Sequence, residues 1–359
     1  MSTVVESGSG EPPEPAKQRL SFSGSGSEYF GIWLTNLLLT IATLGVYSAW
    51  AKVRRLRYFR GNTWLDGHAF DFHGRGGRIL LGRLIALALL AAFQFATSFG
   101  LSFGIAGGGL LLLAAPWLAI ASLRFRAHNT SYRGVRFEFE GRYAKAFPAY
   151  ALWSGLSAVS LGTLAPYASR AQQQYSIRRH GWGGRSFDTS VSVPELYGAM
   201  CVVAFAFLLG GLLAFGGGMF LGGVFFEDGG EPSPESAAFI GFVIGLVIYL
   251  PILWGLLFYR ASVWAETVRD AGFDAGRLRF STDFDPGRMA GIQLTNLFGI
   301  VATLGLFAPW AAVRAARYRL ESLELTGDLE TLDLEGRGAA SEAAAGEEIG
   351  GFFDLDFGL

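Results

Sequence analysis

The chain has 359 residues, of which 51% are hydrophobic and only 16% are charged, whereas about a quarter of the residues of a soluble protein are usually charged. Its 50 glycines, 31 phenylalanines and long apolar runs are typical of a polytopic membrane protein rather than of two or three soluble domains. The single cysteine, Cys201, excludes an intrachain disulfide and a thiolate metal site.

The charges are unevenly distributed along the chain. Residues 321–359 carry eleven acids against Arg337 alone, so the remainder is basic although the net charge is −1. A basic body predicts contact with the bilayer and with anionic phospholipids. We expect no nucleic-acid partner, because the arginines stand beside apolar helices. The sequence leaves a protein partner or a homo-oligomer open.

The chain begins with an acidic segment that contains proline and lacks an apolar core. We interpret residues 1–19 as a disordered cytosolic lead-in and expect no signal peptide before the first apolar stretch. Residues 20–335 are the predicted membrane domain, and residues 336–359 are a flexible acidic tail.

Two pairs of apolar segments are long enough to cross a bilayer. The first pair covers 79–125 with an uncharged turn near Gly100, and the second covers 196–259 with an acidic link. A shorter apolar segment stands before the first pair, another stands between the two pairs, and a third follows the second pair. The order is therefore single, pair, single, pair, single.

Each single segment ends in the same motif, which predicts three copies of one helical unit, at 20–74, 137–187 and 278–333. A glycine after an apolar run stops a helix, and proline suits the first turn of the next, so we expect a short helix, a turn and a second helix. The structural residues of the motif are Thr43, Gly45, Trp50, Ser160, Gly162, Pro166, Tyr167, Thr303, Gly305, Pro309 and Trp310.

Charge decides how many segments span. If all seven crossed, the acidic link of the second pair would share a side with the basic residues 52–60, against the positive-inside tendency. If only the two pairs cross, every arginine-bearing connection lies on one face. We therefore favour four spans and three re-entrant or interfacial hairpins. The alternative has six spans, in which only the middle copy fails to cross.

Several connections alternate apolar and polar residues, as in FDFHG at 70–74 and FEFEG at 137–141. Similar alternation occurs at Leu20 and Phe22, at Leu278 and Phe280, and at Leu323 and Leu325. This period of two is typical of half-buried strands. The predicted fold is an α-helical polytopic membrane protein with three repeated helical units and a minor cytosolic β layer, of class α+β.

These motifs together resemble the YjgN family of bacterial inner-membrane proteins. The resemblance rests on the F-x-G lead, the T-L-G-x-Y-x-x-W-A run, the R-x-x-R-Y ending and the N-T-x-x-x-G-x-x-F-x-F-x-G link, and it covers about residues 20–333. It implies a multi-pass protein of the bacterial inner (cytoplasmic) membrane, and it implies no biochemical activity. The middle copy departs from the pattern, because three glutamines at 172–174 stand in the segment where the other copies carry arginines.

The candidate binding residues follow the motif on one helical face. They are Arg54, Arg57, Tyr58, Arg314, Arg317 and Tyr318. One interpretation is anchoring at lipid headgroups, and the other is a specific anion or headgroup site where the hairpins meet. Asn36 and Asn296 lie at matching places in apolar segments and predict polar contacts between helices within the membrane.

The sequence shows no pattern of catalytic, cofactor-binding or metal-binding residues. The four histidines lack metal-ligand spacing, and neither a phosphate loop nor a nucleophile elbow is present. We therefore expect a non-enzymatic membrane scaffold or lipid-interacting component without a cofactor. The alternative is a permease-like or channel-like protein whose re-entrant hairpins line the path.

Overall fold

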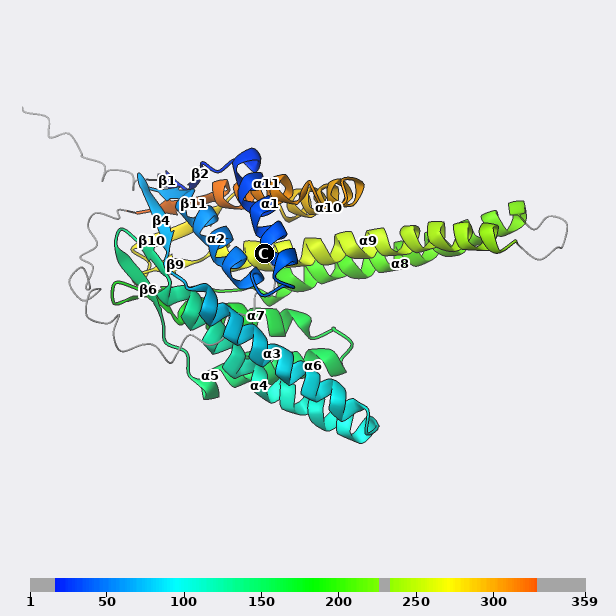
Figure 1. Ribbon diagram of the computed structural model, residues 1–359, viewed down its shortest axis with the longest axis horizontal. Helices are drawn as coiled ribbons and strands as arrows, with labels where there is room; N and C mark the ends of the chain where they lie inside the picture. Colours follow the sequence, from blue (N-terminus) through cyan, green and yellow to red (C-terminus); the bar gives the residue numbers. More distant parts are fainter. Residues whose placement is uncertain (1–16, 226–232, 328–359) are drawn as a thin grey trace, which may run out of the picture.

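The structure, a computed structural model, describes residues 17–225 and 233–327. A β-sheet forms one end of the molecule, and pairs of helices extend away from it (Figure 1). In the described ranges the strands are β1 (Lys17–Arg19), β2 (Ser21–Phe22), β3 (Thr63–Leu65), β4 (His68–Phe72), β5 (Thr130–Tyr132), β6 (Val135–Phe139), β7 (His180–Trp182), β8 (Arg185–Asp188), β9 (Gly272–Phe273), β10 (Leu278–Thr282) and β11 (Leu323–Thr326).

The helices of the same ranges differ greatly in length. They are α1 (Gly26–Ala42), α2 (Ser48–Gly61), α3 (Gly76–Thr97), α4 (Leu101–His128), α5 (Tyr143–Phe147), the π-helix η1 (Pro148–Leu152), α6 (Trp153–Val159), α7 (Ala165–Arg178), α8 (Val193–Phe225), α9 (Pro234–Arg269), α10 (Pro286–Ala302) and α11 (Ala308–Glu321).

The sheet is antiparallel and nearly closed. Its strand order is β1-β11-β10-β9-β8-β7-β6-β5-β4-β3-β2, and β1 and β2 are separated in sequence only by Leu20. The N-terminal segment therefore pairs with β11 through its first half and with β3 through its second half. Closing the sheet in this way protects strand edges that would otherwise be open to other chains.

Tight turns explain why short strands pair so regularly. Asp66-Gly67 and Arg133-Gly134 are two-residue turns in which both residues have positive φ, as primed hairpin turns require. Gly183-Gly184 is a third turn of this kind. These turns direct the strands back toward the helices.

One side of the sheet packs into an aromatic core. Tyr132, Trp182 and Phe273 are almost fully buried, and Phe137 and Phe187 pack against them. Trp182 Nε1 donates to the carbonyl of Val135 at 3.2 Å, so the indole nitrogen also has a partner. The alternating apolar residues of the sequence divide between this core and its neighbours. Leu20, Phe70, Phe137, Leu278, Phe280, Leu323 and Leu325 belong to it, whereas Phe22, Phe72 and Phe139 belong to other clusters.

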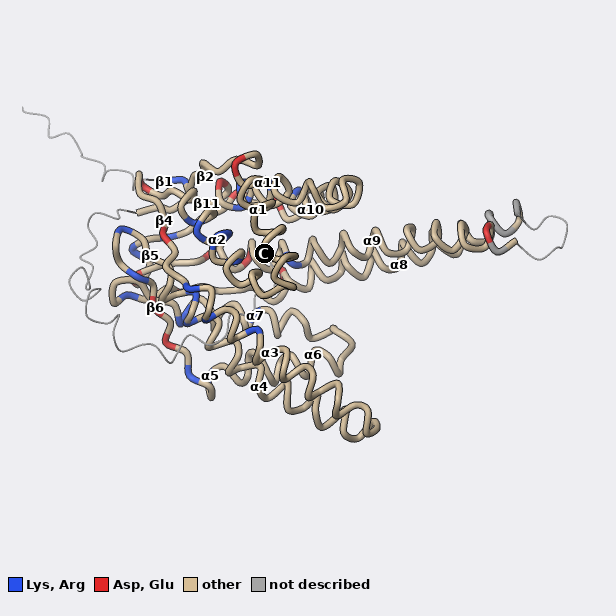
Figure 2. Tube along the Cα trace, viewed as in Figure 1, with Lys and Arg blue, Asp and Glu red and all other residues tan. Residues whose placement is uncertain are grey.

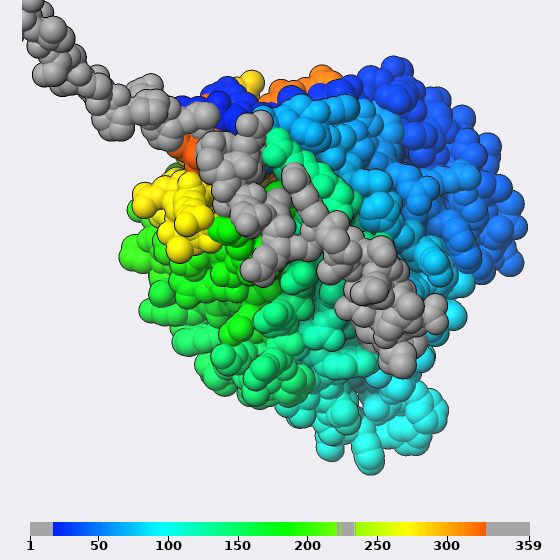
Figure 3. All heavy atoms as spheres, turned by 90° about the vertical axis from the view of Figure 1, so that its left-hand side faces the viewer, coloured from blue at the N-terminus to red at the C-terminus, as the bar shows by residue number. Residues whose placement is uncertain are grey.

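The helical pairs follow one another around the sheet. The second helix of each pair leads into a strand of the sheet, and the strand that follows leads into the next pair. In the view of Figure 3 the sequence colours succeed each other round the molecule, so that the N-terminal and C-terminal described segments lie side by side. The ring of helices is closed by Trp310 of α11, whose ring centroid lies 5.1 Å from that of Phe30 on α1.

Four of the described helices, α3, α4, α8 and α9, are long and apolar enough to cross a membrane. Their 22 to 36 residues correspond to about 33 to 54 Å, against a hydrocarbon core of about 30 Å. α1 and α10 have 17 residues each, or about 26 Å. The four candidates are the two pairs predicted as spanning, with the turn of the first pair at Gly100 as expected.

The predicted β layer was too small. The alternating segments are strands as expected, but the sheet also includes β1, β3, β5, β7, β8 and β9. These strands are too short, with two to four residues, to show a period of two. β1 begins inside the predicted lead-in, while residues 1–16 and the predicted acidic tail lie outside the described residues.

Candidate functional site

The motif that ends the single segments forms a turn with the same backbone geometry in all three places. Leu44, Leu161 and Leu304 have φ values of 51° to 53°, and the following glycines have φ values of 88° to 97°. This left-handed region is strained for leucine but easily adopted by glycine. The helix, turn and second helix predicted for each copy are present.

The tips of these turns are apolar and exposed. Leu44, Leu161 and Leu304 expose 95%, 94% and 95% of their surface. Fully burying one leucine side chain stabilises by about 1.5 to 3 kcal/mol. Leucines at the tips of three separate hairpins are therefore suited to an apolar medium rather than to water.

The hydroxyl of the motif satisfies the turn's own backbone. Thr43 Oγ1 donates to the carbonyl of Leu39 at 2.8 Å and accepts from the amide of Tyr47 at 2.9 Å. Thr303 makes the equivalent bonds, and Ser160 Oγ accepts from the amide of Leu164 at 3.2 Å. Because lipid offers no hydrogen bonds, a turn inside a bilayer needs this internal satisfaction.

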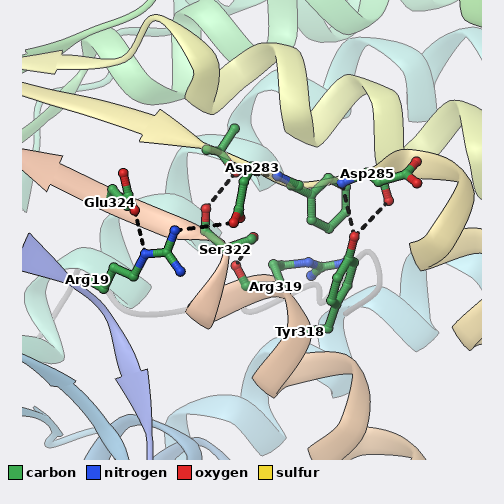
Figure 4. Close-up of polar contacts among 9 residues, drawn as sticks. Arg19, Asp283, Asp285, Tyr318, Arg319, Ser322 and Glu324 are labelled. Carbon is green, nitrogen blue, oxygen red and sulfur yellow. Dashed lines mark hydrogen bonds and ion pairs between the residues drawn. The ribbon is translucent and has the colours of Figure 1, made fainter.

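The tyrosine of each motif holds the start of its own hairpin. Each hydroxyl binds the backbone of the residue 33 positions earlier, just before the first helix of the hairpin. The pairs are Tyr58 with Ser25, Tyr175 with Arg142, and Tyr318 with Asp285. Figure 4 shows the Tyr318 hydroxyl directed at Asp285. Tyr58 and Tyr318, predicted as headgroup contacts, thus have a structural role in these bonds.

The aromatic residue of each motif packs on the neighbouring pair of helices. A side chain at Gly76 on α3 would approach the Trp50 ring to 2.7 Å, and one at Gly26 on α1 would approach Trp310 to 2.2 Å. Tyr167 makes an edge contact with Tyr197 of α8. Pro166 and Pro309 occupy the first turns of α7 and α11, as predicted.

Arg54 and Arg57 line an open groove of about 640 Å³ between α1 and α2. Both arginines are exposed, and their polar contacts are long: Arg54 Nη1 lies 3.5 Å from Asn36 Oδ1, and Arg57 Nε lies 3.5 Å from the carbonyl of Phe72. The other lining residues are Gly31, Ile32, Thr35, Tyr58, Gly61 and Asn62. We name this surface the α1–α2 groove.

The glycines of the groove leave its space open. A Cβ at Gly31 or at Gly61 would meet no atom within 4 Å. Sequence reasoning missed Gly31, Thr35, Gly61 and Asn62. The signal was present, because Gly31 and Thr35 stand four apart on one face of a predicted helix, as do Arg57 and Gly61.

The equivalent arginines of α11 are more fully engaged. Arg314 Nη1 donates to Thr295 Oγ1 at 3.1 Å and lies 3.4 Å from Asn296 Oδ1. Arg317 Nη2 donates to the carbonyl of Gly24 at 2.8 Å, and its Nε lies 3.8 Å from Glu321. The structure therefore brings each predicted asparagine together with an arginine of its own hairpin.

Both asparagines are buried, at 7% and 5% exposure for Asn36 and Asn296. Asn296 Nδ2 donates to the carbonyl of Ala311 across the hairpin at 3.0 Å. In the middle hairpin a different pair, Gln172 and Ser154, bonds at 3.0 Å. Each hairpin thus has a polar bond between its two helices, but only the outer two include arginine.

The sheet end is held together by ion pairs that join distant parts of the chain. Arg19 of β1 binds Glu324 of β11 and also Asp283, at 3.3 Å (Figure 4). The hydrogen bond that Arg19 Nε donates to Glu324, together with the negative charge of that carboxylate, raises the pKa of Arg19. Burial lowers the pKa of His180, whose Nδ1 lies 2.7 Å from the carbonyl of Ser176.

Charged residues are unevenly distributed along the long axis of the molecule. Lys, Arg, Asp and Glu gather at the sheet and at the adjoining helix ends, while the far parts of the helices are almost without them (Figure 2). Glu235, in the first turn of α9, is an acidic residue at the far end. In the described part of the chain, no group of three or more His, Cys, Asp and Glu side chains is arranged to hold a metal.

Comparison with known families agrees with this separation of charged and apolar parts. Residues 17–352 match the family described as bacterial protein of unknown function, DUF898. The chain belongs to this family.

Named relatives are inner membrane proteins. The chain is 33% identical over 129 residues to the inner membrane protein YjgN of Salmonella typhimurium, which is 36% of this chain and 33% of that protein. It is 35% identical over 119 residues to YjgN of Escherichia coli K12, or 33% of this chain and 30% of that protein. The chain thus matches about a third of the length of these relatives. No solved structure matches it.

The resemblance noted from the motifs is therefore confirmed, and the protein is a multi-pass inner membrane protein that sits in a lipid bilayer.

Proposed function

We propose that this protein is a non-enzymatic, lipid-interacting component of the inner membrane. In this proposal α3, α4, α8 and α9 span the bilayer, and three short hairpins dip into the cytoplasmic leaflet and return. The α1–α2 groove binds the headgroup of an anionic phospholipid. The repeated helical unit predicted from the motif is, in this view, a device for leaflet insertion.

The observation that carries the proposal is the exposure of Leu44, Leu161 and Leu304 on turns that satisfy their own backbone. Leu44 stands ten positions before Arg54, and Leu304 ten positions before Arg314. The helical parts of these segments, Ser48–Arg54 and Ala308–Arg314, span about 9 Å at 1.5 Å per residue, and the turn lies beyond them. An arginine at headgroup level therefore places its leucine inside the apolar leaflet.

Charge supports the same orientation. The basic sheet end on the cytoplasmic side agrees with the positive-inside tendency, and Glu235 at the far end of α9 then lies on the opposite side. A permease-like or channel-like role would require the hairpins to line a water-filled path. Asn36 and Asn296 instead bond within their own hairpins, and the sheet encloses an aromatic core, which favours the lipid role.

The insertion of the hairpins is tested by cysteine labelling of the protein in vesicles. The native Cys201 is first replaced with Ala, and single cysteines are introduced at Leu44, Leu161 and Leu304, with Ser186 on the exposed sheet surface as a matched control. We expect membrane-impermeant thiol reagents to label position 186 from one side and none of the tips from either side. Labelling of position 44 or 304 from the side opposite to position 186 would contradict re-entrant hairpins.

The headgroup role is tested separately in detergent. We expect native mass spectrometry to show phosphatidylglycerol retained in preference to phosphatidylcholine, and Gly31→Leu, which fills the groove, to abolish the preference. Gly77→Leu is the control, since a Cβ at Gly77 also meets nothing within 4 Å. An unchanged preference in Gly31→Leu would remove the groove from the proposal.

A further inference from the structure

A second cavity lies on the sheet, away from the α1–α2 groove. It has a volume of about 390 Å³ and is lined by side chains of β4, β5, β6 and the residues next to them. These strands lie at the charged end of the molecule (Figure 2). The lining side chains with polar groups are His68, Asp71, His73, Ser131, Arg133 and Arg136.

Strand register places the polar groups of this cavity on the outer face of the sheet. Asp71 pairs with Ser131, and Ser131 pairs with Arg136. Their neighbours Phe70, Tyr132 and Val135 belong to the aromatic core on the inner face. Because side chains alternate along a strand, the three polar residues stand side by side facing outward.

The floor of the cavity is a buried serine held by a histidine. Ser131 is only 5% exposed, and its Oγ lies 2.9 Å from His73 Nε2. Asp71 Oδ2 approaches the same nitrogen, at 3.8 Å. A catalytic triad requires the carboxylate on the other ring nitrogen, so this arrangement is suited to binding rather than to nucleophilic attack.

The two arginines of the cavity differ in their engagement. Arg133 forms an ion pair with Asp66 and lies over the Tyr132 ring. In the described ranges the guanidinium of Arg136 makes no hydrogen bond or ion pair, although the side chain is partly buried. A partly buried guanidinium beside a hydroxyl and an imidazole can donate several hydrogen bonds to one anion.

We propose that this cavity binds a small phosphate-bearing anion, with Arg136 and the Ser131 hydroxyl as its donors and His73 orienting that hydroxyl. The volume is at the lower end of the range for small-molecule sites, which suits a phosphorylated compound of a few carbons. Asp71 is the acidic group of the lining and opposes the anion. The site is independent of the lipid role, since it shares no residue with the α1–α2 groove.

The test is isothermal titration calorimetry of the full chain in an uncharged detergent, with inorganic phosphate and glycerol 3-phosphate as probes. We expect Arg136→Gln to weaken binding at least tenfold and Asp71→Asn to strengthen it about threefold. Arg279→Gln is the matched control, because Arg279 is an exposed arginine on β10, four strands away in the sheet. It should leave the affinity unchanged.

Short-chain phosphatidylglycerol as a competitor distinguishes the source of the phosphate. If phosphatidylglycerol does not compete with the probes, the site is assigned to a soluble compound. If it competes in the wild-type chain and no longer does so in Arg136→Gln, the site is assigned to a lipid headgroup. The proposal is overturned if the wild-type chain binds neither probe at millimolar concentration. Equal losses in Arg136→Gln and Arg279→Gln would also overturn it, provided that thermal unfolding shows both variants to be folded.

Discussion

The α1–α2 and α10–α11 hairpins place the same residue types at the same separations and yet present different surfaces. Each has a threonine and an asparagine on its first helix and an arginine 18 residues after the asparagine. Of the eight positions that line the α1–α2 groove, two differ in the α10–α11 hairpin, where Glu321 replaces Gly61 and Ser322 replaces Asn62. Glu321 approaches Arg317, whereas Gly61 leaves the α1–α2 groove open. Of these two differences, only the one at Gly61 and Glu321 changes the charge of the surface.

The largest expected effect concerns what the hairpins share, namely their apolar tips. Leu44→Asp and Leu304→Asp should each destabilise the protein in bilayers by up to about 3 kcal/mol, because an aspartate costs about that much at the bilayer centre and less toward the interface. SDS-induced unfolding in bicelles measures this, with Leu44→Asn and Leu304→Asn as uncharged controls. If Leu44→Asp is as stable as Leu44→Asn, the tip is in water.

The next effect separates the two hairpins. Arg54→Gln/Arg57→Gln should weaken phosphatidylglycerol binding by about 2 kcal/mol, or roughly thirtyfold, since each arginine near an anionic surface contributes about 1 kcal/mol. Arg314→Gln/Arg317→Gln should cost about half as much, because Arg317 already faces Glu321. Native mass spectrometry with titrated lipid measures both. Equal losses would show that the groove has no special role.

Removing the tyrosine hydroxyls should lower the stability of the protein by different amounts in the two hairpins. Tyr58→Phe loses bonds to Ser25 and to Glu28 at an almost buried position, so we expect a cost of about 1.5 kcal/mol. Tyr318→Phe loses only the bonds to Asp285 at a more exposed position and should cost about 1 kcal/mol. Thermal unfolding in detergent compares them. A larger cost for Tyr318→Phe would contradict this account.

The smallest effect is expected from exchanging Gly61 and Glu321 between the two hairpins. Gly61→Glu should lower the affinity of the α1–α2 groove for phosphatidylglycerol about threefold, and Glu321→Gly should raise that of the α10–α11 hairpin by a similar factor, since an exposed ion pair is worth below 1 kcal/mol. Gly61→Gln and Glu321→Gln separate charge from size. Opposite shifts in the two hairpins support the comparison, and shifts of the same sign refute it.

Local features of the fold could be predicted from local patterns. The turn at Thr43–Gly45, the proline at the start of α11 and the uncharged turn at Gly100 all depend on neighbouring residues. Two-residue and three-residue strands such as β9 and β7 were not predicted, because they are shorter than one clear alternation. The irregular η1 in the middle copy also gave no signal in the pattern.

The candidate site was predictable only in part. Arg54 and Arg57 follow from their spacing on one helical face, but the open groove beside them depends on how α1 packs on α2. The hydrogen bonds between Tyr58 and Ser25 could not be predicted either, because two residues 33 positions apart meet only when the hairpin forms. The cavity with Ser131 and His73 joins strands whose pairing the sequence did not show.

The sequence by itself determined a membrane protein with two long apolar pairs, three short hairpins and a basic end, because length, hydropathy and charge act within each segment. The tertiary structure decided that Lys17–Arg19 pairs with β11 across the whole chain and nearly closes the sheet. It also decided that Arg136 faces outward beside Ser131. Such contacts depend on the packing of all the segments together, and no local pattern in the chain encodes them.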